Sequence, residues 1–396
     1  MPKKLGSWMA AFMILALAAG SLTLAWQEQR VGVRNQVPRI DFKPEYVSQL
    51  KLPAGFHIEL WAENMGSARM MAVADDGTVY LTRPRDGDVL ILRDADRDGR
   101  ADAPVTFASD LKGVQGIALH KGYLYYSQIS KIWRAKLKAD GSGETPEVFL
   151  EGLPEAPSHT NRPLVFGPDG MLYVAVGSSC NACEETNPEH ATLLQVDLST
   201  RKRTIFARGL RNTVGLAFNP TTRQIWGTDQ DTDWRGDDQP PEELNLIEEG
   251  QHYGWPYCYG KAVPDKLLEK APAGETVEQF CGRSRPAIVN LVPHGSMLGA
   301  LFYTGNQFPA EYRGDFFIAQ HGSWNRSEPI GYRIARVDFE KGKPVVQQET
   351  PFVSDWLTPD RKQQWGRPVG LAQLRDGSLL VSEDSNGKIY RVTYKK

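Results

Sequence analysis

The chain of 396 residues has almost no net charge, few cysteines and, after residue 30, no sustained helical period. Its 46 lysines and arginines stand against 48 aspartates and glutamates, a net charge of −2, which argues against a nucleic-acid-binding footprint. Turn-forming residues are abundant instead: 37 glycines and 26 prolines accompany 10 tryptophans. Together with the missing helical period, this composition favours an all-β protein with many turns.

Only four cysteines are present. No histidine follows the C-x-x-C pair Cys180 and Cys183, which excludes covalent haem attachment. Cys258 and Cys281 bracket a Lys/Pro/Ala-rich excursion, so local disulfides 180–183 and 258–281 are the simplest of the three possible pairings. A redox-active C-x-x-C and a four-cysteine zinc site are the alternatives, but neither a second C-x-x-C nor a thioredoxin-like βαβ pattern supports them.

One pattern recurs six times: a short polar residue, an apolar quartet containing Gly or Ala, a turn and a second strand-like run. The units begin at Arg69, Gln115, Asn161, Asn212, Gly299 and Arg367. The turns at positions 77, 122, 170 and 222 are 45, 48 and 52 residues apart, close to the ~40–50 residues of a propeller blade. The sequence therefore predicts a six-bladed β-propeller over residues 51–396. One large insertion, from Tyr257 to Val292, is expected to form part of the rim above the channel.

The N-terminus resembles an export signal. Lys3 and Lys4 precede a mostly apolar stretch from Trp8 to Leu24, with small residues near Ala25 that suit cleavage. We expect residues 1–25 to be a signal peptide or, because the stretch is nearly long enough to span a bilayer, an N-terminal membrane anchor. Residues 26–50 have the composition of a polar linker. A periplasmic or secreted protein follows, in a compartment where disulfides persist.

The residues that lead the inner strands are expected at the mouth of the propeller channel. They are unusually cationic and rich in hydrogen-bonding groups: Arg69, Gln115, His159 to Arg162, Arg211, Asn212, His294 to Ser296 and Arg367. Converging arginines repel one another unless a polyanion or acidic neighbours lie between them, and a ligand with several carboxylates is the economical solution. A polar, water-filled channel is the alternative.

Two histidines, His159 and His321, lie at the ends of predicted blade strands. An imidazole with an ordinary pKa near 6.5 suits proton abstraction at neutral pH. Each histidine could instead be a structural hydrogen-bonding residue.

These blocks resemble the secreted quinoprotein sugar dehydrogenases, the group of soluble glucose dehydrogenase, aldose sugar dehydrogenase and L-sorbosone dehydrogenase. The resemblance covers roughly residues 50 to 395. It is strongest in residues 209–218, 227–232, 243–247 and 250–256, with support from residues 52–56, the His159 loop, 321–326 and 366–370. It implies a propeller that binds pyrroloquinoline quinone (PQQ), a tricarboxylated redox cofactor, with Ca²⁺. The implied reaction is oxidation of an aldose or sugar aldehyde at C1.

The resemblance also implies residue roles. His159 would be the general base that takes the proton of the C1 hydroxyl while hydride passes to the quinone. Arg211 and Asn212 would contact the quinone oxygens, where a cation stabilises developing charge. The backbone carbonyls of Asp231 and Thr232 would bind the Ca²⁺ of the cofactor. The remaining residues expected to bind the cofactor are Arg69, His321, Arg326 and Arg367, the last through a cofactor carboxylate.

Two departures separate this chain from the glucose dehydrogenases. Gln320 and His321 stand where those enzymes place a lysine, and Gln115 lies a few residues off the register of their sugar-binding glutamine. The sorbosone and aldose branch is therefore the closer match, and glucose is not implied as the substrate. Because the chain has no haem motif or second redox motif, a separate cytochrome or quinone must accept the electrons.

A second metal candidate is the D-x-D-x-D-G segment of Asp94, Asp96 and Asp98, whose spacing suits a calcium loop. Val105 stands where such a loop has its bidentate glutamate, so the segment is either a structural Ca²⁺ site or a solvated acidic turn.

Two other functions remain open, a Ca²⁺-dependent lactonase or esterase and a non-catalytic binding module. A lactonase needs acidic and amide side chains on its metal, whereas the predicted channel mouth is mainly Arg and His. A binding module has no need of His159, Arg211 with Asn212, and Arg367 on three different blades.

Overall fold

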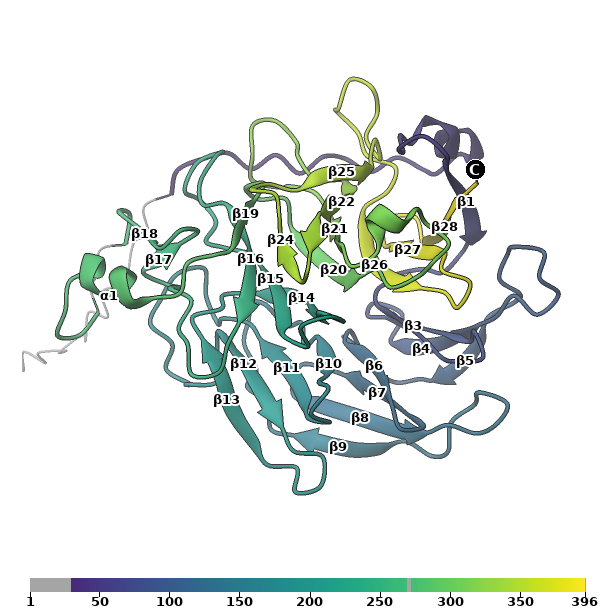
Figure 1. Ribbon diagram of the computed structural model, residues 1–396, viewed down its shortest axis with the longest axis horizontal. Helices are drawn as coiled ribbons and strands as arrows, with labels where there is room; N and C mark the ends of the chain where they lie inside the picture. Colours follow the sequence, from purple (N-terminus) through teal and green to yellow (C-terminus); the bar gives the residue numbers. More distant parts are fainter. Residues whose placement is uncertain (1–29, 269–271, 396) are drawn as a thin grey trace, which may run out of the picture.

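The computed structural model describes residues 30–268 and 272–395, which form six four-stranded antiparallel sheets around a common axis (Figure 1). The predicted all-β six-bladed propeller is confirmed. Blade one contains β2 (Met71–Val73), β3 (Val79–Arg83), β4 (Asp88–Leu92) and β5 (Val105–Ala108). Blade two contains β6 (Ile117–His120), β7 (Tyr123–Ser127), β8 (Lys131–Lys136) and β9 (Glu147–Glu151). Blade three contains β10 (Leu164–Phe166), β11 (Leu172–Val176), β12 (Thr192–Val196) and β13 (Arg203–Arg208).

The next two blades carry additions between their third and fourth strands. Blade four contains β14 (Thr213–Phe218), β15 (Ile225–Asp229), β16 (Glu242–Ile247) and β19 (Val289–Leu291). Blade five contains β20 (Met297–Phe302), β21 (Phe316–Gln320), β22 (Arg333–Val337) and β25 (Thr350–Val353). A short hairpin, β23 (Phe339–Glu340) with β24 (Lys343–Pro344), follows β22, and a 3₁₀ turn, η2 (Ala310–Tyr312), precedes β21.

Blade six joins the two ends of the described chain. From the axis outward its first three strands are β26 (Pro368–Gln373), β27 (Leu379–Glu383) and β28 (Lys388–Tyr394), and β1 (Phe56–Ala62) adds the outermost strand. The β1–β28 register places Phe56 opposite Tyr394. The Phe56 ring lies 4.8 Å from Phe308, 4.9 Å from Phe352 and 5.0 Å from Tyr394, in edge-on contacts that favour this closure. The ring is therefore held shut by backbone hydrogen bonds and by an aromatic core shared between blades five and six.

Glycines in and next to the inner strands let neighbouring blades approach closely. A Cβ at Gly116 would lie 2.1 Å from the carbonyl oxygen of Arg162, and one at Gly370 would lie 2.3 Å from that of Arg69. Both distances are too short for a real side chain, so the recurring glycine of the sequence repeat is a packing requirement of the ring. The inner strands line a cavity of about 130 Å³ on the axis with glycine and apolar residues from all six blades.

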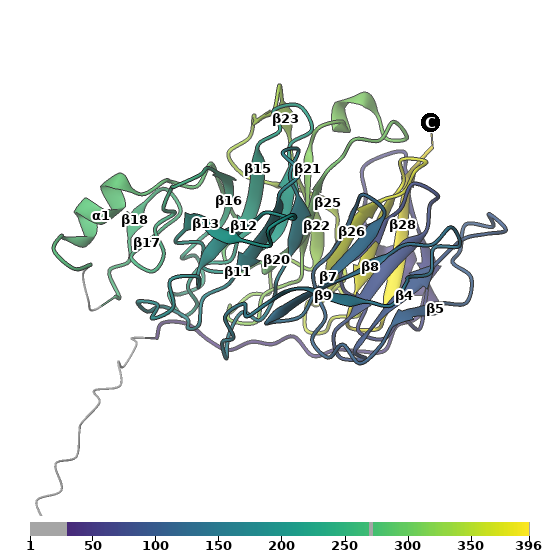
Figure 2. The ribbon, with the colours of Figure 1, turned by 90° about the horizontal axis from the view of Figure 1, so that it is seen from below.

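The insertion belongs to blade four. It occupies residues 248–288 between β16 and β19, and contains β17 (Cys258–Tyr259), β18 (Val263–Pro264) and α1 (Val277–Arg283). The helix begins at a capping box formed by Thr276 and Gln279. Figures 1 and 2 show α1, β17 and β18 projecting from one edge of the ring. The sequence predicted that the insertion runs to Val292, but Val289–Leu291 pair with β16 and form β19.

Residues 30–50, the described part of the expected linker, lie against the propeller. Val31 donates to the carbonyl of Trp234, Asn35 to that of Trp324 and Ile40 to that of Gln364, so the segment crosses loops of blades four, five and six. Figure 1 shows this purple segment along the upper edge of the ring. It ends in a 3₁₀ helix, η1 (Pro44–Gln49).

The expected signal peptide or anchor, residues 1–25, lies outside the described residues. Among the helices of the described chain, none has the length and apolar character needed to cross a membrane.

Candidate active site

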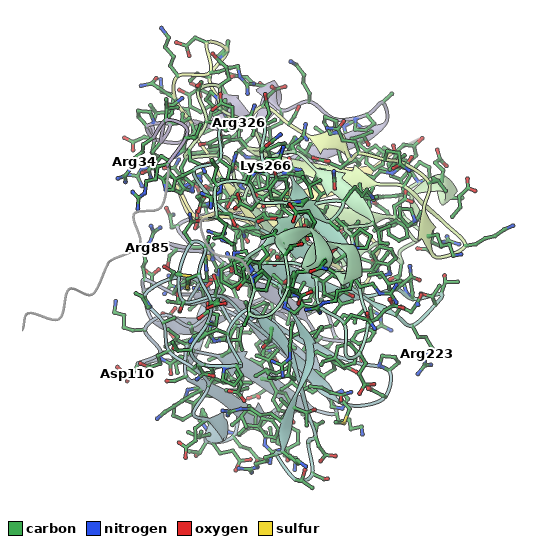
Figure 3. All side chains as sticks on the ribbon, turned by 90° about the vertical axis from the view of Figure 1, so that its left-hand side faces the viewer. Arg34, Arg85, Asp110, Arg223, Lys266 and Arg326 are labelled. Carbon is green, nitrogen blue, oxygen red and sulfur yellow. A yellow bond between two sulfur atoms is a disulfide. The ribbon has the colours of Figure 1, made fainter. Side chains whose placement is uncertain are left out.

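One face of the propeller carries the loops that lead the inner strands. Arg69, His159, Arg211 and Arg367 precede inner strands, and His321 directly follows β21 on the same face, because β21 is antiparallel to the inner strand β20. Figure 3 views the ring from its side and places Arg34 and Arg85 on this face, with Arg223 of the β14–β15 turn on the opposite one. These polar residues therefore lie on one face of the ring.

A cavity of about 310 Å³ opens on this face between blades three, four and five. It brings together four of the predicted site residues, His159, Arg211, Asn212 and Asp231. His294 and Ser296, which were expected at the channel mouth, also line it. The other lining residues, none of them named from the sequence, are Ser158, Gln230, Asp233, Glu242, Trp324 and Asn325.

His159 is oriented by Ser178. Its Nδ1 lies 3.1 Å from the Ser178 carbonyl oxygen and 2.8 Å from Ser178 Oγ. The Ser178 hydroxyl donates to the Cys180 carbonyl at 2.7 Å, so Nδ1 must be the protonated nitrogen and Nε2 carries the lone pair. Burial lowers the pKa of His159 to about 3, and the positive charges of Arg211 and Arg162 add to this effect. The imidazole is therefore a neutral base at physiological pH.

Arg211 lies beneath the cavity with a side chain only 3% exposed. Its Nε donates to the Asn181 carbonyl at 2.9 Å, Nη1 to the Gln230 carbonyl at 3.0 Å, and Nη2 to Asn181 Oδ1 at 2.8 Å. Nη2 also pairs with Asp233 Oδ2 at 2.9 Å. Protein groups therefore hold every guanidinium nitrogen in place.

The turn that carries Arg211 and Asn212 is shaped by Asp229 at the end of β15. The backbone N–H groups of Arg211 and Asn212 donate to its carboxylate at 2.8 and 2.9 Å, and Thr213 Oγ1 donates at 2.7 Å. The β14–β15 register, which places Thr213 opposite Asp229, brings these groups together. Asp229 thus fixes the backbone from which the Asn212 side chain enters the cavity.

Buried carboxyl groups crowd the blade-four side of the cavity. Burial raises the pKa of Asp229 to about 6 and that of Asp231 to about 7, and it raises the pKa of Glu242 and Glu243 well above the usual value. Glu242 accepts from the backbone N–H of Asp231 at 2.9 Å and from that of Ser296 at 3.2 Å. A bound cation would favour the ionised form of these groups.

The carbonyl oxygens of Asp231 and Thr232 accept no hydrogen bond from the described residues, although both residues are buried. Unpaired carbonyls beside carboxylates form an oxygen donor set of the kind that Ca²⁺ prefers. The residues present therefore fit the predicted ion.

A second cluster on the same face surrounds Asp384, which follows β27. Arg69 Nη1 and His321 Nε2 each lie 2.8 Å from one of its two carboxylate oxygens. Burial alone would raise the pKa of Asp384, but His321, Arg69 and Arg367 hold it below its ordinary range. Burial and the charge of Arg367 lower the pKa of His321 to about 4. Arg367 donates to the carbonyls of His321 and Gly322 at 3.0 and 2.7 Å.

Arg326 is separate from both groups. Its guanidinium donates to the Asp237 carbonyl and to Asp238 Oδ1, so it ties two surface loops together. Three of the predicted cofactor ligands, Arg69, His321 and Arg367, thus form the Asp384 cluster, and Arg326 lies at the rim.

The predicted disulfides, Cys180–Cys183 and Cys258–Cys281, are both formed. The loop of Asp94, Asp96 and Asp98 lies between β4 and β5, on the face opposite the cavity. One oxygen of each carboxylate lies within 4.8 Å of the others. Whether this loop binds Ca²⁺ stays a prediction.

Residues 50–395 match the protein-family model described as TrAA12-like. The chain belongs to the TrAA12-like family. An uncharacterized protein of Borreliella burgdorferi is 32% identical over 367 residues, which cover 89% of this TrAA12-like chain and 93% of the relative. An aldose sugar dehydrogenase of Escherichia coli K12 is 24% identical over 261 residues, 60% of each chain.

Solved structures show the same fold. A calcium structure of the Trichoderma reesei member of carbohydrate-active enzyme family AA12 superposes with a TM-score of 0.76 at 22% identity, covering 92% of this chain and 99% of the other. The PQQ domain of a pyranose dehydrogenase from Coprinopsis cinerea gives 0.75 at 18% identity, covering 90% and 98%.

Proposed function

We propose that this protein is a quinoprotein oxidoreductase that oxidises an aldose or a sugar aldehyde at C1, with PQQ and Ca²⁺ as cofactors and His159 as the general base. The observation that carries the proposal is the shared cavity. A neutral His159, the Arg211–Asn212 pair and the Asp231 loop with its unpaired carbonyls come from blades three and four and meet in one space. The family supports it, because relatives named for this chemistry share the fold.

The chain's own residues divide the work. His159 Nε2 accepts the proton of the sugar C1 hydroxyl, since its Nδ1 is occupied by Ser178. Arg211 and Asn212 would contact the oxygens of the quinone, where the charge of Arg211, held in place by Asn181 and Asp233, would stabilise negative charge. The carbonyls of Asp231 and Thr232 would hold the Ca²⁺. When bound, PQQ supplies the two-electron oxidant that accepts hydride from C1.

A separate cytochrome or quinone would reoxidise the cofactor. We further propose a periplasmic or secreted location, which agrees with the two disulfides and with the composition of residues 1–25.

One observation favours a second candidate, the Ca²⁺-dependent lactonase or esterase. The cavity is lined by Asp231, Asp233 and Glu242 together with the amides of Asn212 and Asn325, and such acidic and amide groups are what a hydrolytic metal site needs. The channel mouth predicted from the sequence is mainly Arg and His, and this acidic lining differs from that prediction.

The deciding experiment is reconstitution of the apo-protein lacking residues 1–26. PQQ and Ca²⁺ are added separately and together, and dye reduction is followed with a panel of aldoses and sorbosone. We expect dye reduction that requires both additions. Sugar-lactone or ester hydrolysis with Ca²⁺ alone, and no dye reduction, would support the hydrolase instead.

A further inference from the structure

The loop closed by the Cys180–Cys183 disulfide lies between the two proposed functional side chains, His159 and Arg211. At its start, Ser178 contacts His159 Nδ1 through both its carbonyl and its hydroxyl, and that hydroxyl donates to the Cys180 carbonyl at 2.7 Å. Ser178 is fully buried, so its position depends on the loop and not on solvent. The orientation of His159 is thus linked directly to the first cysteine of the bridge.

Asn181, inside the loop, connects the bridge to Arg211 and to blade four. Its Oδ1 accepts from Arg211 Nη2 and from the Asp233 backbone N–H, each at 2.8 Å. Its Nδ2 donates to the Asp233 carbonyl at 3.1 Å. Its own carbonyl accepts from Arg211 Nε at 2.9 Å and from Trp255 Nε1 at 3.2 Å. One residue therefore joins blade three, blade four and the insertion.

We propose that Asn181 is a positioning residue and that the Cys180–Cys183 bridge holds it in register with Ser178, so that one covalently closed loop orients both His159 and Arg211. This inference rests on the proposed function for its catalytic meaning. Neither Asn181 nor the bridge acts on the substrate; they act through the two side chains they hold.

The bridge can hold both contacts, that of Ser178 with His159 and that of Asn181 with Arg211, because few residues lie between them. Ser178 and Asn181 are three positions apart, and the bridge removes much of the freedom of the backbone between them. Without it, the loop can keep one contact while losing the other. Arg211 would then keep its charge in a buried place with fewer acceptors, and water would reach His159.

The first test uses the apo-protein and needs no cofactor. The imidazole of His159 is titrated by NMR, with its signal assigned by loss in His159→Gln. The charged groups that affect it are Arg211 and Arg162, and with burial they lower its pKa to about 3, so the wild-type imidazole stays neutral at pH 5. In Asn181→Ala and in Cys180→Ser/Cys183→Ser we expect the pKa to rise toward 6.5, because water enters and Arg211 moves.

The matched control is Cys258→Ser/Cys281→Ser, which removes the other disulfide while leaving the loop closed. It should lower stability and leave the His159 titration as in the wild type. Asn181→Asp keeps the Oδ1 acceptor but adds a negative charge beside Arg211, which by itself raises the pKa of His159, so this variant is compared by turnover and not by titration. If the double cysteine variant fails to fold, Asn181→Ala carries the titration test with both disulfides intact.

The second test measures the reconstituted protein. Both loop variants should lower kcat at least tenfold, and Asn181→Asp should recover much of that loss. A folded Asn181→Ala variant with wild-type His159 titration and wild-type turnover would overturn the inference. If the wild type oxidises no sugar, the proposed function fails, while the titration still decides whether the loop positions His159.

Discussion

Arg69 donates from Nη1 to Oδ2 of Asp384 over 2.8 Å, although the two residues are 315 positions apart in the chain. Converging arginines repel one another unless an acidic group or an anionic ligand lies between them. For Arg69 the protein itself supplies that acidic group, Asp384. Arg211 is likewise paired with Asp233. Arg367 differs, because within the described residues it donates only to two neutral carbonyls and forms no ion pair. Arg162, which also leads an inner strand, likewise donates only to carbonyls, but its side chain is fully buried. Arg367 is therefore the partly exposed arginine of this set that forms no ion pair with a described residue, although it contributes to the lowered pKa of Asp384.

Replacing Arg367 with Ala should therefore weaken PQQ binding more than it slows turnover of the saturated enzyme. The lost charge would face a cofactor carboxylate remote from the reacting carbonyl. Cofactor titration and kcat at saturating PQQ separate the two effects. Arg69→Ala should weaken binding less, since Asp384 already compensates that charge, and Arg375→Ala on the opposite face is the control. A fall in kcat with unchanged cofactor affinity would contradict the assignment.

His159→Ala should leave PQQ binding largely intact and lower turnover by roughly 10²–10⁴-fold, the usual contribution of a general base. The physical reason is the free Nε2 lone pair, which the Ser178 contacts to Nδ1 secure. Steady-state kinetics and cofactor titration of the same preparation check both parts. His57→Gln, exposed on β1, is the control. Loss of cofactor binding with unchanged residual turnover would reject the role of base.

Removing calcium with a chelator should abolish tight PQQ binding, and added Ca²⁺ should restore it and raise Tm by mass action. Asp231→Asn should weaken the Ca²⁺ response, because it removes a carboxylate beside the unpaired carbonyls of residues 231 and 232. Asp96→Asn/Asp98→Asn changes only the loop on the opposite face and should retain Ca²⁺-dependent cofactor binding. The opposite pattern would move the functional ion to that loop.

The sequence was sufficient for the architecture because the features that define a blade are local. Gly116 and Gly370 stand beside or within inner strands, where the neighbouring backbone leaves no room for a Cβ. The disulfides were predictable for the same reason, because each closes a short segment. His159, Arg211 and Asn212 were also found, since each leads an inner strand.

The partners of these residues were not predicted. Asp384 pairs with Arg69, and Asn181 with Arg211, only because the ring closes and a loop folds back, and neither contact leaves a pattern in the local sequence. A signal did exist for the acidic side of the cavity. Asp229 ends the buried strand β15, and Asp231 and Asp233 follow it at alternate positions, a spacing that places all three at one end of blade four.

His252 gives a test of pH-dependent stability outside the proposed site. Its Nδ1 accepts from the Gly254 N–H at 3.1 Å, and burial, with Arg283 and Arg208 nearby, lowers its pKa to about 4. In the unfolded chain a histidine titrates near 6.5. Between these values the unfolded state binds a proton that the folded state does not, so the free energy of unfolding falls as pH falls. Above pH 6.5 the contribution of His252 is complete.

The difference in unfolding free energy between wild type and His252→Gln should therefore shrink as pH falls, by at most about 2 kcal/mol between pH 7 and pH 5. Urea denaturation of both proteins at pH 7, 6 and 5 measures this difference. The carboxyl groups whose pKa is raised are present in both proteins, so their contribution to the unfolding free energy cancels from the difference. A difference that stays constant or widens on acidification would mean that His252 is protonated in the folded state, and that the Gly254 N–H does not donate to it.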